Sequence, residues 1–366
     1  MKKLRGKKRT KAHRKRLDQS LNVQFHPALK KTPLINTKYT VPEEKQSSLS
    51  YSYLSTFDKI KEAVPLERLK ECVDTLYLDQ HVIAINKPPG ILSARANDNT
   101  LDMQNVLKSY MLKHRDFRDW KRFLNRSIFD KFTKTEPFVG VLHRVDKSTS
   151  GVVLYGRHEA ATKKFIDLFA RRKVKKTYIA VIRGEPPSKS ADLEHYIATT
   201  NWPVVRIQSG DQFRAMNAEK KEDGDGDGAD GGDEGVEEAE VVGMKRDGEK
   251  LKWKRARLHY RHLQTFVFQR LQYSVLRVQC FTGRQHQVRA QLSFEKMPII
   301  GDRKYHCRVP FIPNKNEDAI ALHAWLLEYS CPMTGNMKSI EAPLPDYWND
   351  RFGSQIHTDV FDHLQT

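Results

Sequence analysis

The chain has 366 residues, of which 39% are hydrophobic and 30% are charged, a composition typical of a soluble globular protein with some polar segments. It has no run of about 18 apolar residues and no apolar stretch at its amino terminus, so we expect neither a membrane-spanning helix nor a secretory signal. Its net charge of +19 indicates a polyanionic partner, because Lys and Arg displace the counterions of a phosphate backbone.

We expect the first 75 residues to form a basic, largely disordered extension. Residues 1–17 contain ten Lys or Arg and almost no apolar side chain, so no element there can bury a face. This arm fits an RNA-binding tail, a nuclear address or a plain solvated tail, whereas a mitochondrial transit peptide needs an amphipathic pattern that it lacks. Residues 18–75 are polar, with one weakly helical stretch at 58–72.

From residue 76 onward, apolar runs of strand and helix length predict a folded domain over residues 76–348. Apolar and β-branched runs predict strands at residues 78–85, 139–142, 151–155, 177–182, 271–280 and 321–329. Apolar residues at helical spacing predict helices at residues 102–113, 161–169 and 285–294. The domain is therefore of the α+β class, and we expect residues 349–366 to be a carboxy-terminal tail.

An acidic insertion, expected to be disordered, interrupts this domain at about residues 216–250. Residues 222–240 hold ten carboxylates and no basic residue, and their Asp and Gly content disfavours both helix and strand. Without them, the 64 Lys and Arg of the chain face only 35 acidic residues. The excess of positive charge on the folded part is therefore larger than the net charge suggests.

No metal site is predicted. The minimal spacing of a calcium-binding EF-hand loop is present in the insertion, at Asp223, Asp225, Asp227, Gly228 and Glu234. However, no amphipathic helices flank it, and Asp230 stands where such loops place an apolar residue, so a flexible acidic segment is the better interpretation. The four cysteines are widely spaced and form no CxxC pair, which predicts reduced thiols.

The polar loop at residues 143–150 carries the strongest concentration of reactive groups. His143, Arg144 and Asp146 lie within four positions, between two predicted strands. A carboxylate flanked by cations stays ionised, so Asp146 could serve as a nucleophile or a base at neutral pH. The alternative is a surface turn in which Asp146 accepts hydrogen bonds from nearby amides. A kinase catalytic loop is excluded, because Val145 separates the Arg from the Asp.

The segment HRVDKSTSGVVLYGR resembles the HRLD-x-x-TSG motif of the RluA-type RNA pseudouridine synthases. Four further segments resemble that family in the same order: VIAINKPPGIL, KKTYIAVIRGEP, FTGRQHQVRAQLSFEKMPIIGDRKY and ALHAWLLEYSCPMTG. Together they span residues 76–348, interrupted only by the acidic insertion. The chain departs from the family pattern at Val145 (usually Leu), at Gln285 and Gln291 (commonly Thr or Ser, and His), and at Cys331 (usually His).

The resemblance implies a pseudouridine synthase fold, with a central mixed, largely antiparallel sheet flanked by helices and loops. It also implies the isomerisation of uridine to pseudouridine in RNA, without cofactor or metal. Asp146 is then the catalytic carboxylate, Tyr178 stacks on the base and can assist the loss of the C5 proton, and Arg289 pairs with Asp146. Helical spacing would place Gln285, Arg289 and Leu292 on one face, so that Arg289 points inward.

The resemblance further implies that Arg144 takes the place of the extruded nucleotide and that His143 braces the loop. RNA contacts are expected from His143, Arg144, Lys176, Arg284, His286 and Gln287. The expected substrate is structured RNA with an unpaired target, ribosomal RNA or transfer RNA, and we expect a monomer. An idle RNA-binding scaffold that contacts ribosome-assembly proteins is the alternative, and the nucleus or nucleolus and the mitochondrion both stay open as compartments.

Overall fold

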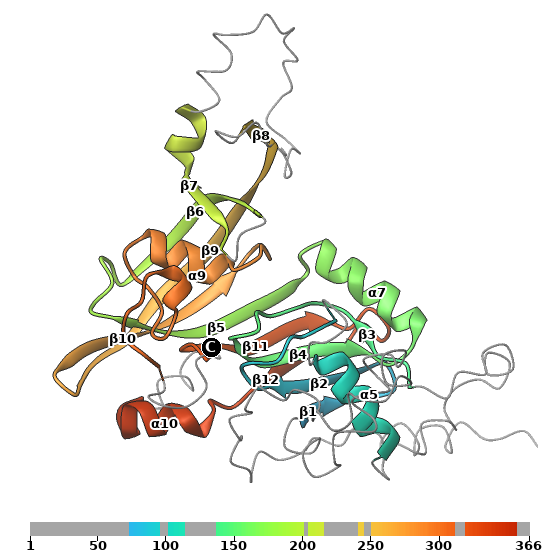
Figure 1. The fold of residues 1–366 in the computed structure, drawn as a ribbon. Helices are drawn as coiled ribbons and strands as arrows, with labels where there is room; N and C mark the ends of the chain where they lie inside the picture. The colour runs from blue at the N-terminus through green and yellow to red at the C-terminus, as the bar shows by residue number, and fades with distance from the viewer. Residues whose placement is uncertain are drawn as a thin grey trace, which may run out of the picture.

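The computed structural model describes residues 73–95, 102–113, 137–200, 204–215, 241–244, 250–311 and 319–356. In this part of the chain, one 12-stranded sheet runs through the molecule in the order β1-β2-β4-β11-β5-β10-β9-β6-β7, with β3, β8 and β12 paired at its side (Figure 1). The pairing of β11 with β4 is parallel, and the other strand pairings are antiparallel. The predicted α+β class with a mixed, largely antiparallel sheet is thus confirmed.

Two helices cover opposite faces of the amino-terminal half of the sheet. Its elements are β1 (Asp74–Leu78), β2 (Val82–Lys87), α5 (Met103–Lys113), β3 (Gly140–Val141), β4 (Ser150–Gly156), α7 (Glu159–Ala170) and β5 (Val174–Arg183). Because side chains alternate along a strand, Ile83 and Val153 pack with α5 while Ala84 and Leu154 pack with α7. Strands buried on both faces in this way need continuous apolar runs, which β2 and β4 have.

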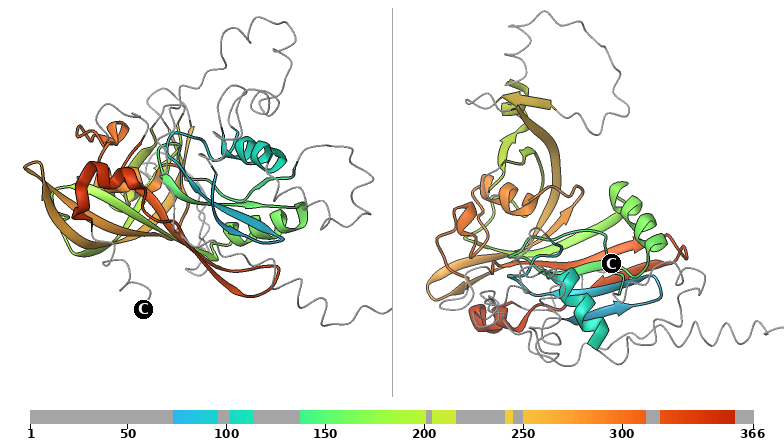
Figure 2. Two further views of the ribbon diagram at one scale, coloured as in Figure 1. Left: turned by 90° about the horizontal axis from the view of Figure 1, so that it is seen from below. Right: turned by 45° about the vertical axis from the view of Figure 1, so that its right-hand side comes forward.

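The carboxy-terminal half contains the longest strand and a projecting arm. Its elements are β6 (Ser190–Ala198), β7 (Arg206–Ser209), β8 (Val241–Met244), β9 (Lys250–Phe268), β10 (Leu271–Cys280), α9 (Gln287–Phe294), η3 (Arg303–Tyr305), β11 (Leu322–Ser330), β12 (Met337–Glu341), α10 (Asp346–Phe352) and η4 (Gly353–Gln355). The amino-terminal part of β9 extends with β6, β7 and β8 away from the rest of the sheet (Figures 1 and 2). Helix α9 lies against β6, β7 and η3, and its Val288 and Leu292 are buried in the main hydrophobic core.

Most predicted elements of the folded domain are present, with shifted ends. Strand β10 matches its predicted range of 271–280, and α5 matches the predicted helix at 102–113 to within one residue. The apolar run at 78–85 was expected to be one strand, which is wrong: β1 ends at Leu78 and β2 begins at Val82. Asp79 makes the turn between them, since its Oδ1 accepts hydrogen bonds from the amides of His81 (2.7 Å) and Val82 (2.8 Å).

Three further expectations need correction. Residues 241–244 of the supposed disordered insertion form β8, which pairs with the start of β9. The carboxy-terminal tail expected from residue 349 continues the fold, because Phe352 and Ile356 are buried in the main hydrophobic core. Helix α9 begins at Gln287 rather than at 285, so Gln285 is an exposed loop residue and does not share a helical face with Arg289.

Other expectations lie outside the described residues, namely the basic arm, the stretch at 58–72 and the EF-hand-like spacing at 223–234. Among the described residues, no helix combines the length and apolar character needed to cross a membrane. Cys280, Cys307 and Cys331 are free and buried, as expected for reduced thiols.

Candidate active site

The loop at residues 142–149, which joins β3 to β4 and carries Asp146, is held on both sides of that residue. On the amino-terminal side, the hydroxyl of Ser93 donates to the Val145 carbonyl (2.9 Å) and accepts from the Val145 amide (3.1 Å). Ser93 is itself buried. On the carboxy-terminal side, the Thr149 amide donates to the Asp146 carbonyl (3.1 Å) and closes a turn. The backbone that aims the carboxylate is therefore fixed.

A buried lysine supports the same loop. Lys87 Nζ donates to the carbonyls of Pro88 (2.8 Å), Ile91 (2.9 Å) and Lys147 (3.2 Å), and the Gly90 amide also donates to the Lys147 carbonyl (2.7 Å). Burial lowers the pKa of Lys87 to about 7, although the charge of Asp146 acts in the opposite direction. The Lys-Pro-Pro-Gly turn thus serves the loop as a support.

A glycine at the end of the loop allows the parallel contact between β4 and β11. Gly151 has a φ of +109°, and a Cβ atom there would lie 2.2 Å from the Ala324 carbonyl oxygen. The neighbouring Ser150 hydroxyl lies 2.8 Å from His323 Nδ1, whose ring places Nε2 3.1 Å from the Ala342 carbonyl. These contacts fit a neutral His323 protonated on Nε2, and burial lowers its pKa to about 4.

Arg289 joins two carboxylates. Its Nε and Nη2 donate to the Asp302 carboxylate (2.7 and 2.8 Å), while Nη1 donates to Asp146 Oδ2 (3.2 Å). Asp302 is 1% exposed, and the guanidinium also lies over the Tyr305 ring, 5.0 Å from its centroid. Burial alone would lower the pKa of Arg289, but the two carboxylates outweigh it and raise the pKa. Arg289 is therefore a fixed cation beside Asp146.

Tyr178 lies close to the same carboxylate from β5. It pairs with Val278 of β10, and its ring packs partly against both main hydrophobic clusters. Burial raises its pKa well above the ordinary value, with smaller contributions from Cys280 and Asp146. Tyr178 therefore stays protonated at neutral pH.

His143 and Arg144 are neighbours in sequence with opposite surroundings. The His143 ring stacks on Phe169 of α7 (4.6 Å between centroids), and its Nε2 accepts a hydrogen bond from the Leu154 amide (3.0 Å). Removal from water lowers the pKa of His143 to about 3, and nearby Lys176 adds to the effect. His143 is thus a neutral brace between the loop and α7, while Arg144 is exposed to solvent.

Two residues near the loop between β10 and α9 were expected to contact RNA, and they differ in exposure: Gln287 is buried, whereas Arg284 is partly exposed. Gln287 is 5% exposed, and its Oε1 accepts from the Thr282 hydroxyl (2.7 Å) and the Arg284 amide (3.0 Å). Its Nε2 donates to the Arg257 carbonyl (2.9 Å). The structure thus places Gln287 in the loop scaffold, while Arg284 lies closer to the surface.

Two other residues of this set tie the loop to its surroundings. His286, in the left-handed conformation (φ 52°), places Nδ1 2.8 Å from the Tyr305 hydroxyl, and burial lowers its pKa. Lys176 Nζ donates to the Thr282 carbonyl (3.2 Å), and burial lowers its pKa as well. The loop before α9 is therefore anchored to β5 and to η3.

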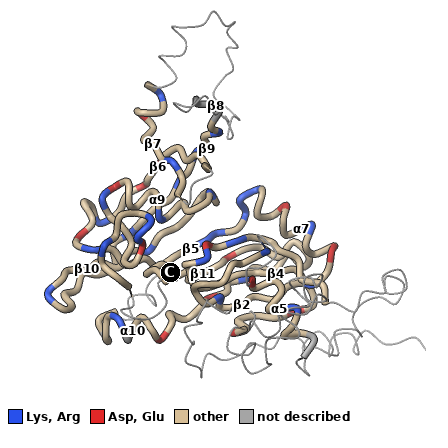
Figure 3. Tube along the Cα trace, viewed as in Figure 1, with Lys and Arg blue, Asp and Glu red and all other residues tan. Residues whose placement is uncertain are grey.

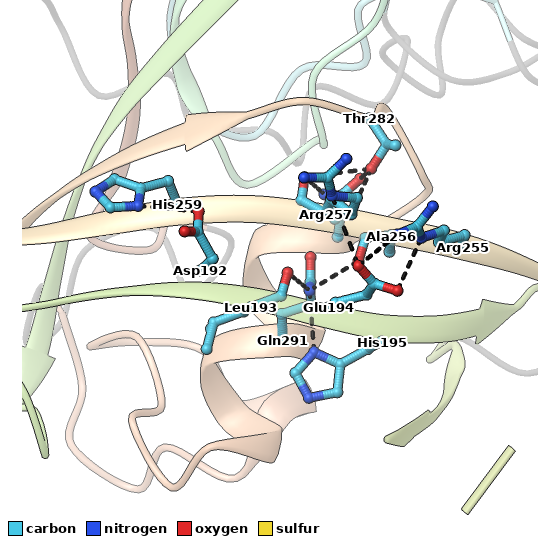
Figure 4. Close-up of polar contacts among 11 residues, drawn as sticks. Asp192, Leu193, Glu194, His195, Arg255, Ala256, Arg257, His259, Thr282 and Gln291 are labelled. Carbon is cyan, nitrogen blue, oxygen red and sulfur yellow. Dashed lines mark hydrogen bonds and ion pairs between the residues drawn. The ribbon is translucent and has the colours of Figure 1, made fainter. Parts of the chain in front are cut away.

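The departure at Gln291 belongs to a buried polar network under α9 (Figure 4). Its Nε2 lies within hydrogen-bonding distance of the carbonyls of Leu193 (3.1 Å) and Ala256 (3.2 Å), and of His195 Nδ1 (3.0 Å). His195 Nε2 lies 2.9 Å from Glu295 Oε1, so the contacts fit a neutral His195 protonated on Nε2. Burial lowers the pKa of His195, and Glu295 partly opposes this. The network attaches the helix of Arg289 to β6 and β9.

Sequence reasoning assigned no role to Asp302, Tyr305 or Ser93. The first two lie in the Pro-Ile-x-Gly-Asp-x-x-Tyr segment, so a signal for them was present. Their function could not be derived from it, because Asp302 contacts Arg289 across a turn whose geometry the residue pattern does not give. Ser93 follows the Lys-Pro-Pro-Gly turn by three residues and has no motif of its own.

The family of this chain follows from its similarity to known proteins. Residues 81–294, more than half of the chain, match the RNA pseudouridylate synthase family. The chain therefore belongs to that family of enzymes, and the resemblance to the RluA type is confirmed.

Curated relatives from bacteria carry names of the same family. An uncharacterized RNA pseudouridine synthase of Chloroflexus aurantiacus is 30% identical over 56% of this chain and 50% of its own length. A ribosomal large subunit pseudouridine synthase D of Xylella fastidiosa is 27% identical over 79% of this chain and 69% of its own length. A tRNA pseudouridine synthase C of Haemophilus ducreyi is 26% identical over 79% of this chain and 99% of its own length.

Among solved structures, the human RNA pseudouridylate synthase domain containing 4 is similar in fold. The match has a TM-score of 0.50 and 20% sequence identity, and it covers 78% of this chain and 95% of that one. At this identity, the likeness concerns the fold.

Proposed function

We propose that the protein isomerises uridine to pseudouridine in structured RNA, with Asp146 as the catalytic carboxylate and without a cofactor. The bond between ribose C1′ and uracil N1 breaks, the base turns, and a bond forms between C1′ and C5. The proton on C5 is lost and N1 gains one, so the product is an isomer of the substrate. The observation that carries the proposal is the ion pair of Asp146 with Arg289, at 3.2 Å.

The surroundings of Asp146 suit either of two chemical routes. The carboxylate attacks C1′ as a nucleophile, or it removes a ribose proton as a base. Both require an ionised carboxylate that is partly accessible, and the Asp146 side chain is 22% exposed beside a guanidinium that is only 5% exposed. Arg289 restricts the rotamer of Asp146, because its other donors are held by Asp302.

Tyr178 and Arg144 complete the proposed assignment. Tyr178, protonated and close to Asp146, is suited to stack on the target uracil. Arg144 is exposed and lies two residues before Asp146. It is suited to replace the extruded base, since a planar cation can both stack and donate hydrogen bonds. Extrusion costs least where the base is already unpaired, which favours loops and bulges of ribosomal or transfer RNA.

The names of the relatives agree with both RNA classes. One relative is named for the large ribosomal subunit and another for tRNA. The proposed substrate is therefore one of these two RNAs, with ribosomal RNA as the first to be tested.

The test is a depletion and replacement experiment with pseudouridine mapping of ribosomal and transfer RNA. Depletion should remove pseudouridine from at least one position, and wild-type protein should restore it. Asp146→Asn keeps the shape of the side chain but removes its charge, so it should restore none. The matched control is Asp167→Asn, which changes an exposed carboxylate on α7 and should restore the modification fully. If depletion leaves every position modified, or if Asp146→Asn restores the signal, the proposal is wrong.

A further inference from the structure

The outward face of the β9–β10 pair carries positive charge away from the catalytic residues. Leu258 and Cys280 point inward and are buried in the core that includes α9. Because side chains alternate along a strand, Arg257 and Phe281 point to the opposite face. Further along the pair, Arg261 lies on the same outward face, about four residues or roughly 13 Å from Arg257. Figure 3 shows Lys and Arg positions along these strands and around α9.

Two arginines on this face stand directly opposite one another. Arg261 of β9 is the cross-strand partner of Arg277 of β10. Like charges in this position destabilise a sheet. Neither guanidinium has an ion-pair partner among the residues that the structure describes, and their side chains reach solvent. A bound polyanion would remove this repulsion.

An exposed aromatic ring lies at the end of the same face. Phe281 is 37% exposed, and the guanidinium of Arg257 lies over its ring, 5.6 Å from the centroid. The Phe281 amide also donates to the Arg257 carbonyl (3.1 Å), which continues the strand pairing and fixes the two residues side by side. An aromatic ring and a guanidinium plane are the surfaces on which unpaired RNA bases stack.

Two acidic residues next to these arginines, Asp192 and Glu194, have partners on β9. Glu194 of β6 accepts two hydrogen bonds from Arg255 (2.8 and 2.7 Å) and lies 3.7 Å from Arg257 (Figure 4). Asp192 pairs with His259 (3.1 Å). The remaining charge of the face is positive, which favours a phosphate backbone over an acidic or neutral protein surface.

We propose that the outward face of β9 and β10 is a second RNA-binding site, which holds a single-stranded segment of the substrate RNA. Arg261 and Arg277 bind its phosphates, and one unpaired base stacks on Phe281 and Arg257. The site lies on the opposite face of the sheet from Cys280 and therefore does not take the target uridine. It rests on the proposed function for its substrate class, since the bound strand is a part of the RNA to be modified.

The first experiment measures binding of a fluorescent single-stranded oligouridine to the full-length protein by anisotropy. Phe281→Ala should weaken binding by about five- to 100-fold, the range found when a stacking aromatic is removed, while Phe281→Trp should preserve it. An abasic oligomer of the same length and charge has no base to stack, so it should bind wild type and Phe281→Ala equally well. The matched control is Val267→Ala, another exposed apolar residue near the far end of β9, which should leave binding unchanged.

The second experiment changes the two arginines together. Arg261→Gln with Arg277→Gln should flatten the salt dependence of log K by about 1.4, or 0.7 for each phosphate contact to a single strand. The same variant should unfold at a higher denaturant concentration in the absence of RNA, because the repulsion is gone. A pair of arginines that does not contact RNA would show the gain in stability without the change in salt slope, so an unchanged salt slope overturns the assignment to phosphates.

The two proposals fail in different ways. The stacking site is overturned if wild type and Phe281→Ala bind oligouridine equally well. It is also overturned if Phe281→Ala loses as much affinity for the abasic oligomer as for oligouridine. Neither result bears on pseudouridine formation. If the mapping experiment finds no pseudouridine that depends on the protein, the proposed function fails, yet the binding differences still report on this face.

Discussion

Replacing Asp302 with Asn tests whether the Asp302 carboxylate holds the Arg289 guanidinium in place for its contact with Asp146. The carboxylate is 1% exposed and accepts two of the three hydrogen bonds of the guanidinium toward acidic side chains. An Asn side chain keeps one acceptor oxygen but turns its NH2 group toward the Arg289 guanidinium, which is itself a donor. One charge-assisted hydrogen bond is therefore lost, and Asp146 remains as the carboxylate that pairs with Arg289. Such a bond contributes about 1.5–3 kcal/mol, and breaking a whole buried pair costs about 3–5 kcal/mol. We expect a loss of about 2–4 kcal/mol in the free energy of unfolding.

The assay is urea denaturation at neutral pH, followed by circular dichroism and fluorescence, with the RNA mapping as the functional readout. Modification by Asp302→Asn should also fall, because a loosened Arg289 no longer restricts the rotamer of Asp146. Asp192→Asn, the same change at an exposed ion pair, should cost less than about 1 kcal/mol. If Asp302→Asn is as stable and as active as that control, the positioning argument is refuted.

Three further outcomes follow from the site. The pKa of Lys87 in the folded protein is lowered to about 7, so above that pH the unfolded chain binds more protons than the folded protein. The wild type should therefore gain stability relative to Lys87→Met between pH 7 and pH 9, as measured by urea titrations. Gly151→Ala should lower the melting temperature far more than Gly184→Ala, because both have positive φ but only the first adds a clash. Gln291→Leu should cost about 1–3 kcal/mol of unfolding free energy by leaving the buried Nδ1 of His195 without its donor, and a neutral result would count against the network.

Local patterns were sufficient for most of the core elements. The predicted helix at 102–113 and the predicted strand at 271–280 were found because their apolar residues repeat at the period of the element, and α5 and β10 follow them closely. The split between β1 and β2 was missed because it depends on one Asp side chain that replaces a turn of backbone hydrogen bonds, within an otherwise apolar run.

The long strand β9 shows where pattern reasoning fails. The segment LKWKRARLHY alternates apolar and basic residues, but the alternation changes phase after Trp253, and the high charge hides the strand period. Its stability comes from pairing with β6 and β10 over nearly its full length, which is tertiary information. The start of α9 was placed too early for a similar reason, because the left-handed His286 depends on the contact with Tyr305.

For the site, the resemblance supplied the residues and the structure supplied their support. The pairing of Arg289 with Asp146 was expected, and the structure places the two side chains together. The pairing of Arg289 with a second carboxylate, that of Asp302, was not expected. A pattern of residue types does not show to which of two acidic groups a guanidinium donates two hydrogen bonds.

The position of β11 has a consequence for the order in which the protein acquires activity. In the sheet, β11 lies between β4 and β5, so the strand that follows Asp146 and the strand that carries Tyr178 are not neighbours. Among the described strands, β11 (residues 322–330) joins them, through a parallel pairing with β4 and an antiparallel pairing with β5. The pairing of β2 with β4 does not need β11, but Asp146 and Tyr178 come together only after a strand far later in the sequence has been inserted between β4 and β5. Contacts of such long sequence separation form slowly, so we expect assembly of the site to be a late step of folding.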